Sequence, residues 1–518
     1  MPSKEGAVAW SHGYNVSSGY THGFYRELAP HWLNFGALLH GYRVPELTGG
    51  FRYLELGTGQ GFGLCALAAV YPQGEFIGVD FNPEHIAHAR GLAEAAGLTN
   101  IRFEEADFSV LAEDWPDDFG AFDYAVMHGI YSWVPEPIRA ALVALLNRAL
   151  QPGGLVYVSY NTLPGWTSAI PLQHMLRRLQ VASSVSGEQI IQQGAALFDN
   201  LVQAGAGVAQ AMPPLKARLD SLKTQSSAYL VQEYLHENWH PLWFSQVHDE
   251  LAAAKLSYVG SATLPENYLP GLLAKEQAEV VNGAEGYVMR QELIDLMLNQ
   301  SFRRDLYCRG PRLQRRSMAQ LGAFSVVAGR PLDETEVCRI STSFGHLTID
   351  FTLAQAIYAA VLDQPRTLDD VASLAPMTEK PVHELIQVVT MLLHAGYLAL
   401  AHSAAARVEA LNDVVSQQVI DEFVPYTCLV GAHTPTALGA SDTDMAFYRI
   451  VRQAPLQNSK QLAAALVDSL RASGRNLVKS GKVLSVPDEA FEHAQTLSEK
   501  FLGQTLPLWQ RLGVMPPP

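Results

Sequence analysis

Residues 55–63, ELGTGQGFG, constrain the fold of this chain more than any other stretch of its sequence. They follow the short apolar run Tyr53–Leu56, which predicts a strand, and they open the apolar run Phe62–Val70, which predicts a helix. Glycines at such a junction let the backbone turn sharply and approach a ligand closely, because no Cβ intervenes. The first N–H groups of the helix then face a polar or anionic group.

The spacing of these glycines separates two kinds of ligand. A dinucleotide fingerprint requires Gly-x-Gly-x-x-Gly. Counting from Gly57 places Phe62 at the last position, and counting from Gly59 places Leu64 there, so neither register fits. The acid before the first glycine suits a ligand with an amino acid group, because Glu55 can bind its ammonium directly or through water. The residues expected to bind this ligand are Glu55, Gly57, Thr58, Gly59 and Gly61.

The region 52–161 alternates between strand and helix patterns. Strands are predicted at Tyr53–Leu56, Phe76–Asp80, Ile101–Glu105, Phe122–Met127 and Leu155–Tyr160, and helices at Phe62–Val70, Pro83–Ala96 and Pro135–Leu150. We expect the last of these helices to end at the breaker Pro152-Gly153-Gly154. The alternation predicts an α/β fold with a parallel, doubly wound sheet. Beyond it, Leu256–Val259 is expected to return to the sheet, and residues 283–316 read as a helical pattern ending in an arginine cluster.

Two more acidic residues end the next two predicted strands. Asp80 lies roughly 20 residues after Gly61, the spacing at which a carboxylate accepts hydrogen bonds from ribose hydroxyls. Asp107 can accept a hydrogen bond from an adenine amino group, with Phe108 covering the ring, and Phe81 is expected beside them. Each acid taken alone also fits a solvated loop residue or a helix cap. Together they lie at the carboxyl ends of successive parallel strands, where open α/β sheets bind ligands.

Composition narrows the choice of partners. The 518 residues include 36 Lys and Arg against 51 Asp and Glu, a net charge of −15. Such a chain is a poor candidate for nucleic-acid binding, which depends on neutralising phosphates. The four cysteines lie far apart, which indicates neither a disulfide framework nor a zinc knuckle. Residues 1–10 lack an apolar signal core, and no apolar stretch reaches the ~18 residues of a membrane helix. We therefore expect a soluble, cytoplasmic protein of about three to four domains, with no membrane insertion.

One stretch of the sequence matches a zinc-binding pattern but does not predict a zinc site. His236-Glu237-Asn-Trp-His240 matches the zinc-protease pattern, which requires both histidines on one face of a continuous helix. Pro241 follows at once and biases His240 away from helical dihedral angles. The place of a third ligand holds Gln246. No metal site is expected.

The whole pattern resembles class I S-adenosylmethionine (SAM)-dependent methyltransferases. Two stretches, FDYAVMHGIYSWVP at 122–135 and YVSYNTLPGW at 157–166, resemble one subfamily, which carries a methyltransferase regulatory domain. That subfamily includes bacterial protein-lysine methyltransferases that act on outer-membrane proteins. Residues 19–30, 236–237 and 299–303 are also similar to it. Leu163 departs from the aromatic residue of the lysine enzymes, which bears on the substrate but not on the cofactor.

The resemblance implies in-line transfer of a methyl group from the sulfonium of SAM to a nucleophile. The residues implied to line the acceptor channel are Tyr131, Trp133, Tyr160 and Trp166, just past the fourth and fifth strands. His128 is a candidate base and cofactor contact, and Asn161 a candidate for binding the acceptor amine, although Thr162-Leu163 breaks the Asn-Pro-Pro-Tyr motif. Core packing remains the open alternative for the aromatic residues and for His128. Tyr20 is expected to contact the cofactor from an N-terminal lid, or else to anchor the N-terminal helices.

The expected organisation has four parts. An aromatic cap or lid covers 1–45, the SAM-binding domain covers 46–265 with a helical insertion at about 170–235, a regulatory, winged-helix-like domain covers 266–405, and a helical domain covers 406–518. The arginine cluster at 303–316 reads as a salt-bridge belt or as a docking patch for an acidic partner. By resemblance, the insertion is a homodimer surface.

The function expected from all of this is N-methylation of lysine side chains in a protein substrate. Two alternatives stay open: methylation of a small molecule or glycan, and a module that senses SAM without turnover.

Overall fold

The computed structural model describes residues 22–222, 225, 227–337, 339–402, 406–422, 424–453 and 458–516. Within it the chain forms two compact units, which are described separately below. One unit consists of 106–121 and 125–311, and the other of the described residues in 22–105, 122–124 and 312–516. The expected cofactor contact Tyr20 lies outside the described residues.

The chain contains a seven-stranded, mostly parallel sheet with strand order β3-β2-β1-β4-β5-β7-β6. Its strands are β1 (Phe51–Leu56), β2 (Gly74–Asp80), β3 (Ile101–Glu105), β4 (Phe122–Met127), β5 (Leu150–Asn161), β6 (Leu256–Ser261) and β7 (Phe302–Arg309). Strand β2 pairs in parallel with β1 and β3, whereas β7 runs antiparallel to both β5 and β6. The strand order reverses between β1 and β4, as in doubly wound folds. The predicted fold class is confirmed.

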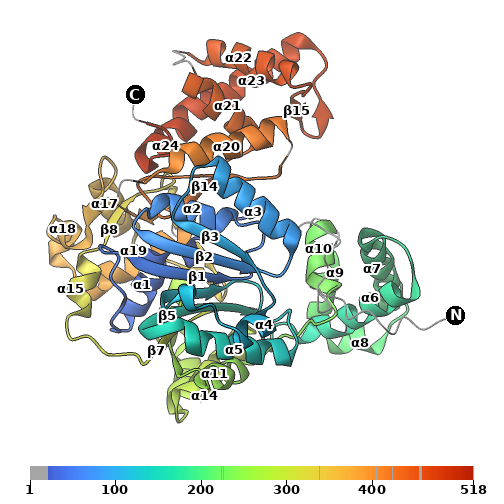
Figure 1. Cartoon of the computed structure of the whole chain (residues 1–518), viewed down its shortest axis with the longest axis vertical. Helices are drawn as coiled ribbons and strands as arrows, with labels where there is room; N and C mark the ends of the chain where they lie inside the picture. The colour runs from blue at the N-terminus through green and yellow to red at the C-terminus, as the bar shows by residue number, and fades with distance from the viewer. Residues whose placement is uncertain are drawn as a thin grey trace. The chain divides into compact units, whose positions relative to one another are not determined.

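Sequence signals explain where the helices of the first half of this sheet begin. Helix α2 (Phe62–Val70) starts after Gly61, which has a φ of 77° and is followed by an almost entirely buried apolar run. Helix α3 (Pro83–Ala95) begins with proline at its first position, and the Asn82 side chain caps it by accepting a hydrogen bond from the Glu84 amide. Figure 1 shows both helices beside the strands β1–β3.

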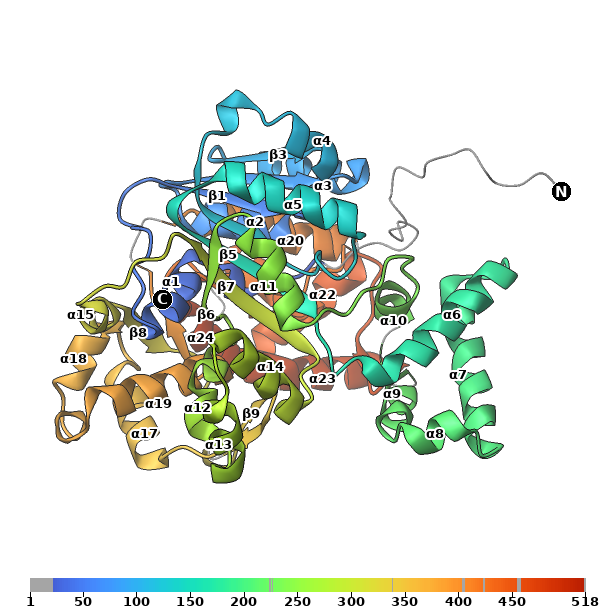
Figure 2. The ribbon, with the colours of Figure 1, turned by 90° about the horizontal axis from the view of Figure 1, so that it is seen from below.

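The unit formed by 106–121 and 125–311 contains the next helices along the chain after α3. They are α4 (Phe108–Glu113), α5 (Glu136–Ala149), α6 (Ile170–Ala182), α7 (Gly187–Gln203), α8 (Gly207–Ala211), α9 (Pro214–Leu222), α10 (Ser227–Tyr234), α11 (Phe244–Ala252), α12 (Leu269–Leu272), α13 (Lys275–Gly283) and α14 (Tyr287–Leu298). Helices α6–α10 gather into one cluster (Figure 2) around an apolar core of their own, which includes Trp166 and Trp239.

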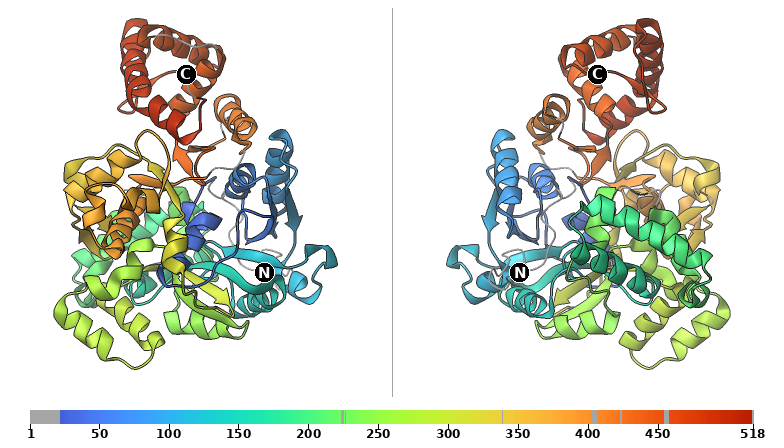
Figure 3. Two further views of the ribbon diagram at one scale, coloured as in Figure 1. Left: turned by 90° about the vertical axis from the view of Figure 1, so that its left-hand side faces the viewer. Right: turned by 90° about the vertical axis from the view of Figure 1, so that its right-hand side faces the viewer.

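The other unit continues after residue 312 with small sheets and helices. Its elements are α1 (Pro30–Leu39), α15 (Ser317–Gly322), β8 (Ser325–Ala328), α16 (Glu334–Val337), β9 (Ile340–Thr342), β10 (Gly345–Leu347), α17 (Phe351–Ala360), β11 (Arg366–Thr367), α18 (Leu368–Ala372), α19 (Val382–Ala395), β12 (Leu398–Leu400), α20 (Val408–Asp421), β13 (Cys428–Val430), β14 (Ala437–Gly439), α21 (Asp442–Gln453), α22 (Ser459–Ala472), β15 (Val478–Lys479), β16 (Lys482–Val483), α23 (Pro487–Lys500) and α24 (Leu506–Leu512). Strands β11, β8 and β12 form a three-stranded sheet, and α20 packs against α2 and α3. Figure 3 shows α21–α24 as one helical group.

The sequence predictions for individual elements hold except in two places. The strands predicted within β1–β5 are all present, as is the late strand, now β6. The helix predicted at Pro135–Leu150 ends at Ala149, but Pro152–Gly154 do not separate it from the next strand, because they belong to β5, which starts at Leu150 and not at the predicted Leu155. The helical reading of residues 283–316 is wrong in its second half, because β7 occupies Phe302–Arg309.

The expected domain boundary at residue 265 falls between β6 and β7, which are neighbours in one sheet.

The two histidines of the zinc-protease string do not share a helix face. Helix α10 ends at Tyr234, so His236 and His240 lie beyond it. None of the helices in the described ranges combines the length and the apolar character needed to cross a bilayer.

Candidate functional site

The glycine loop between β1 and α2 has the backbone that its sequence predicts. Gly57, Gly59 and Gly61 all have positive φ, at 79°, 55° and 77°. Other residues rarely adopt this region, whereas glycine does so without strain. The loop is tied to the end of β2, because the Gly57 amide donates to the Val79 carbonyl at 2.7 Å. The predicted ligand-binding loop therefore presents backbone atoms without side chains next to the end of β2.

Glu55 is a buried acid at the end of β1, with 8% of its surface exposed. The Thr58 hydroxyl donates to its Oε2 at 2.8 Å. Burial raises the pKa of Glu55 to about 7, the Thr58 hydrogen bond lowers it, and the negative charge of Asp80 raises it further. A bound ammonium would offset the burial of this charge, so the carboxylate suits an amino acid ligand.

Asp80 fastens the loop to the start of α3. Its carboxylate accepts hydrogen bonds from the Gly59 amide (Oδ2, 2.9 Å) and the Asn82 amide (Oδ1, 2.9 Å), and the His85 ring lies 3.3 Å from Oδ1. A carboxylate accepts about four hydrogen bonds, so capacity remains for ribose hydroxyls. Phe81, expected beside the ligand, is half-buried directly after Asp80. Together the glycines, Glu55 and Asp80 fit a nucleoside that carries an amino acid group.

A ring cluster beside this loop was not predicted. The His88 Nδ1 lies 2.9 Å from the Gln60 carbonyl oxygen, and the Tyr426 hydroxyl lies 3.1 Å from the His88 Nε2. The His22 ring packs edge-on against both, at 5.1 and 5.0 Å between ring centroids. Tyr426 follows α20 and is 338 residues from His88 in sequence, so no local pattern could have found it.

In the other unit, Asp107 and Phe108 begin the short helix α4. The Asp107 carboxylate caps this helix by accepting a hydrogen bond from the Ser109 amide at 2.7 Å, and the Phe108 ring is buried. The capping role is the alternative that the sequence left open for such an acid. Their contact with an adenine ring stays a prediction.

His128 follows β4 directly and lies among hydroxyl groups. Its Nδ1 is 2.8 Å from the Tyr157 hydroxyl and 3.2 Å from the Ser159 hydroxyl. Burial, and to a smaller extent the positive charge of Arg304, lower its pKa to about 3. His128 is therefore an uncharged hydrogen-bonding group near neutral pH, and its roles as a base and as a cofactor contact stay predictions.

Three of the aromatic residues expected at the acceptor channel are buried and have specific partners. The Tyr131 hydroxyl donates to Glu250 at 2.5 Å, and the Tyr160 hydroxyl to Asp305 at 2.6 Å. The Trp166 indole donates to the Ser301 carbonyl at 2.6 Å. These contacts match the packing alternative, and contact with an acceptor stays a prediction for these three.

Trp133 and Asn161 have different surroundings. Trp133 is half-buried, with its ring 5.0 Å from that of His236. Asn161 ends β5, and its side-chain amide donates to the Glu233 Oε1 at 3.0 Å. Glu233 lies in α10 and was not predicted, because nothing in its local sequence distinguishes it from a solvated helical acid. The structure brings it to the end of β5 through the fold of the insertion.

Comparisons with known proteins agree with this architecture. Residues 47–201 match the family described as "Methyltransferase domain", and residues 226–309 match the one described as "Predicted methyltransferase regulatory domain". The uncharacterized protein sll1526 of Synechocystis is 30% identical over 518 residues, which cover 98% of this chain and all of that protein. The uncharacterized protein RP789 of Rickettsia prowazekii is 30% identical over 60% of this chain and 56% of its own length.

Two solved structures share the fold. PKMT2 from Rickettsia typhi matches with a TM-score of 0.70 at 20% identity, covering 96% of this chain and all of that one. The same protein in complex with AdoHcy matches with a TM-score of 0.70 at 19% identity and the same coverage. The two family matches, the full-length relative and the glycine loop with Glu55 and Asp80 lead to one conclusion. This chain belongs to the SAM-dependent methyltransferases that carry a methyltransferase regulatory domain.

Proposed function

We propose that this enzyme transfers methyl groups from SAM to the lysine side chains of a protein substrate. The observation that carries the proposal is the likeness in fold to PKMT2, a protein lysine methyltransferase by its name, over 96% of this chain. The resemblance of residues 122–135 and 157–166 to the lysine enzymes adds to it.

In this proposal the glycine-loop unit binds the cofactor. SAM supplies a methyl group bound to a positively charged sulfur. Glu55 binds the ammonium of its amino acid part, and Asp80 accepts hydrogen bonds from its ribose, while it also holds the Gly59 amide in place. Asp107 and Phe108 remain proposed contacts of the adenine. Alignment of the two reacting centres lowers the activation barrier by several kcal/mol, because binding removes most of their relative translational and rotational freedom.

The acceptor must lose a proton before it can react. Bringing a lysine from its usual pKa of about 10.4 to the neutral form at about pH 7 costs on the order of 4.6 kcal/mol. A desolvating environment lowers this cost because it disfavours the ammonium, and aromatic faces stabilise cations that pass along them. Trp133, which is half-buried beside His236, is the residue proposed to do this.

The test uses SAM labelled on its methyl group and a cell lysate separated by size. Label in the protein fraction, recovered as methyllysine after hydrolysis, supports the proposal. Label in the small-molecule fraction would favour the alternative acceptors, and cofactor binding without any transfer would indicate a sensing role. Trp133→Ala is expected to lower turnover at least tenfold while the affinity for SAM stays within about twofold.

A cytoplasmic location is proposed with this function. In support of it, Cys65, Cys308 and Cys428 are buried free thiols, as is usual in a reducing compartment. Homodimerisation through the helical insertion, taken from the resemblance, stays a prediction that the sedimentation of the purified protein can check.

A further inference from the structure

Glu233 is a buried acid that the proposed cofactor site does not use. It is 9% exposed, and its partner Asn161, whose amide donates to it at 3.0 Å, is 5% exposed. Because Asn161 is the last residue of β5, the pair lies at the carboxyl end of that strand, the edge where open α/β sheets bind ligands. The backbone of Asn161 is held by Ser132, whose hydroxyl accepts a hydrogen bond from the Asn161 backbone N–H at 2.8 Å.

Burial gives Glu233 a pKa near neutral pH, so both its carboxylate and its protonated form are accessible there. Burial raises its pKa to about 7, against smaller lowering effects from hydrogen bonds with Asn161 and Tyr229, the positive charge of Arg218, and Trp239. The Arg218 guanidinium is itself occupied, because it stacks over the Trp166 ring at 4.1 Å and donates to the Gly165 carbonyl at 2.7 Å.

Aromatic side chains beside this pair suit a cation, because Trp239 contacts Glu233, and Trp133, Trp166 and Tyr234 belong to the same apolar cluster as Trp239. Trp133 and His236 pack with ring centroids 5.0 Å apart, and Trp166 packs against Trp239 at 5.5 Å and against Tyr234 at 6.1 Å. Indole faces attract ammonium groups. Burial and the charge of Arg177 lower the pKa of His236 to about 4, so this histidine is uncharged near neutral pH and does not repel a cation.

We propose that Glu233, held by Asn161, binds the ammonium of the acceptor lysine and takes its proton. This inference rests on the proposed function and names the residue that prepares the acceptor. An N–H bond of the ammonium breaks, the proton joins a Glu233 oxygen, and the electron pair stays on nitrogen. The nitrogen then forms a bond to the methyl carbon while the carbon–sulfur bond breaks. The products are a methylated ammonium and S-adenosylhomocysteine (SAH), and Glu233 releases its proton to solvent.

The experiment compares Glu233→Gln with Glu237→Gln. The amide keeps the shape of Glu233 and an oxygen for Asn161, but it neither carries charge nor accepts the proton, and Glu237 is an exposed acid four residues along the chain. Methyl transfer to the labelled protein fraction is measured between about pH 7 and pH 10, and SAH affinity is measured in parallel. Near pH 7 we expect Glu233→Gln to lose at least 100-fold in kcat/KM with SAH affinity within about twofold, while Glu237→Gln stays near wild type.

The pH profile separates proton transfer from a structural role. Without an internal base the variant depends on lysine that is already neutral, so its deficit should shrink as the pH rises toward about 10. A second measurement titrates n-butylammonium into the protein saturated with SAH, and binding is expected to weaken at least tenfold in Glu233→Gln. A variant with wild-type kcat/KM, or with a deficit that is the same at every pH, would overturn the inference and leave the proposed function standing. Absence of label from every fraction with the wild-type enzyme would instead contradict the proposed function, and this inference with it.

Discussion

At the scale of single residues, the proposed role of Glu55 predicts that cofactor binding depends on pH. Burial places its pKa at about 7, and only the carboxylate form attracts an ammonium. The affinity for SAH should therefore fall as the pH drops below about 7, approaching tenfold per pH unit, and level off above it. Isothermal titration at several pH values checks this. Glu55→Gln should bind more weakly and show a flat profile, whereas the exposed Glu75→Gln should keep the wild-type slope; an unchanged slope in Glu55→Gln would contradict the assignment.

Gly61 gives a second prediction at this scale. A Cβ there would lie 2.4 Å from the Ala89 Cβ, and its φ of 77° disfavours other residues. Gly61→Ala should lower the free energy of unfolding by about 1–3 kcal/mol or more, because α3 must move to make room. Gly91→Ala is the matched control within α3, where a Cβ meets nothing within 4 Å, and it should be neutral or stabilise by up to about 1 kcal/mol. Equal denaturant midpoints for the two variants would refute this reading of the loop.

At the scale of elements, β7 shows what sequence reasoning could and could not find. The glycine loop, the strands β1–β4 and the capped helix α3 follow local rules, so the sequence predicts them. Strand β7 carries Arg303 at a position paired with Tyr160 of β5, which looks incompatible with a buried strand. The structure resolves this with buried acidic partners, because Arg303 forms ion pairs with Asp295 of the preceding helix α14 (2.6 Å) and with Asp305 two residues along the same strand (3.0 Å). Such compensation depends on tertiary contacts, and local periodicity does not contain it.

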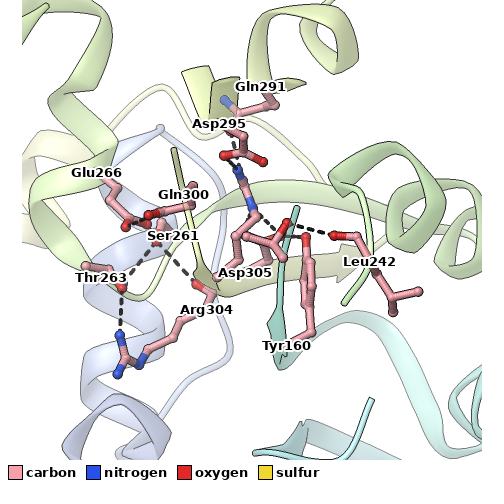
Figure 4. Close-up of polar contacts among 12 residues, drawn as sticks. Tyr160, Leu242, Ser261, Thr263, Glu266, Gln291, Asp295, Gln300, Arg304 and Asp305 are labelled. Carbon is pink, nitrogen blue, oxygen red and sulfur yellow. Dashed lines mark hydrogen bonds and ion pairs between the residues drawn. The ribbon is translucent and has the colours of Figure 1, made fainter. Parts of the chain in front are cut away.

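The same polar network gives a prediction for the element. Figure 4 shows the network around β7. Asp305 accepts a hydrogen bond from the Tyr160 hydroxyl, and Asp295 faces the strand from α14. Removing Arg303 leaves two buried acids without their counter-charge. Arg303→Met should therefore cost about 3–5 kcal/mol of unfolding free energy, measured by denaturant titration. Arg315→Met, an exposed member of the same arginine cluster, should change it by less than about 0.5 kcal/mol, and similar values for both would contradict the buried network.

At the scale of the whole molecule, residues distant in sequence contribute to the candidate sites. Tyr426 reaches the ring cluster beside the glycine loop from beyond α20, and Glu233 reaches the end of β5 from the helical insertion. Neither contact has a signal in the sequence around it. The positions of the acidic residues and glycines of the proposed cofactor site could be predicted because their spacing along one strand–helix pattern determines where they lie. On the acceptor side, the roles of Asn161 and Trp133 stay predictions.

The central claim is that the glycine loop, Glu55 and Asp80 bind SAM. Equilibrium dialysis of the purified chain against labelled SAM tests it most directly. We predict one SAM bound per chain, competition by SAH, and loss of at least 100-fold in affinity in Asp80→Ala with its fold intact by circular dichroism. No saturable binding by the wild-type protein, or the same affinity in a folded Asp80→Ala variant, would contradict the account.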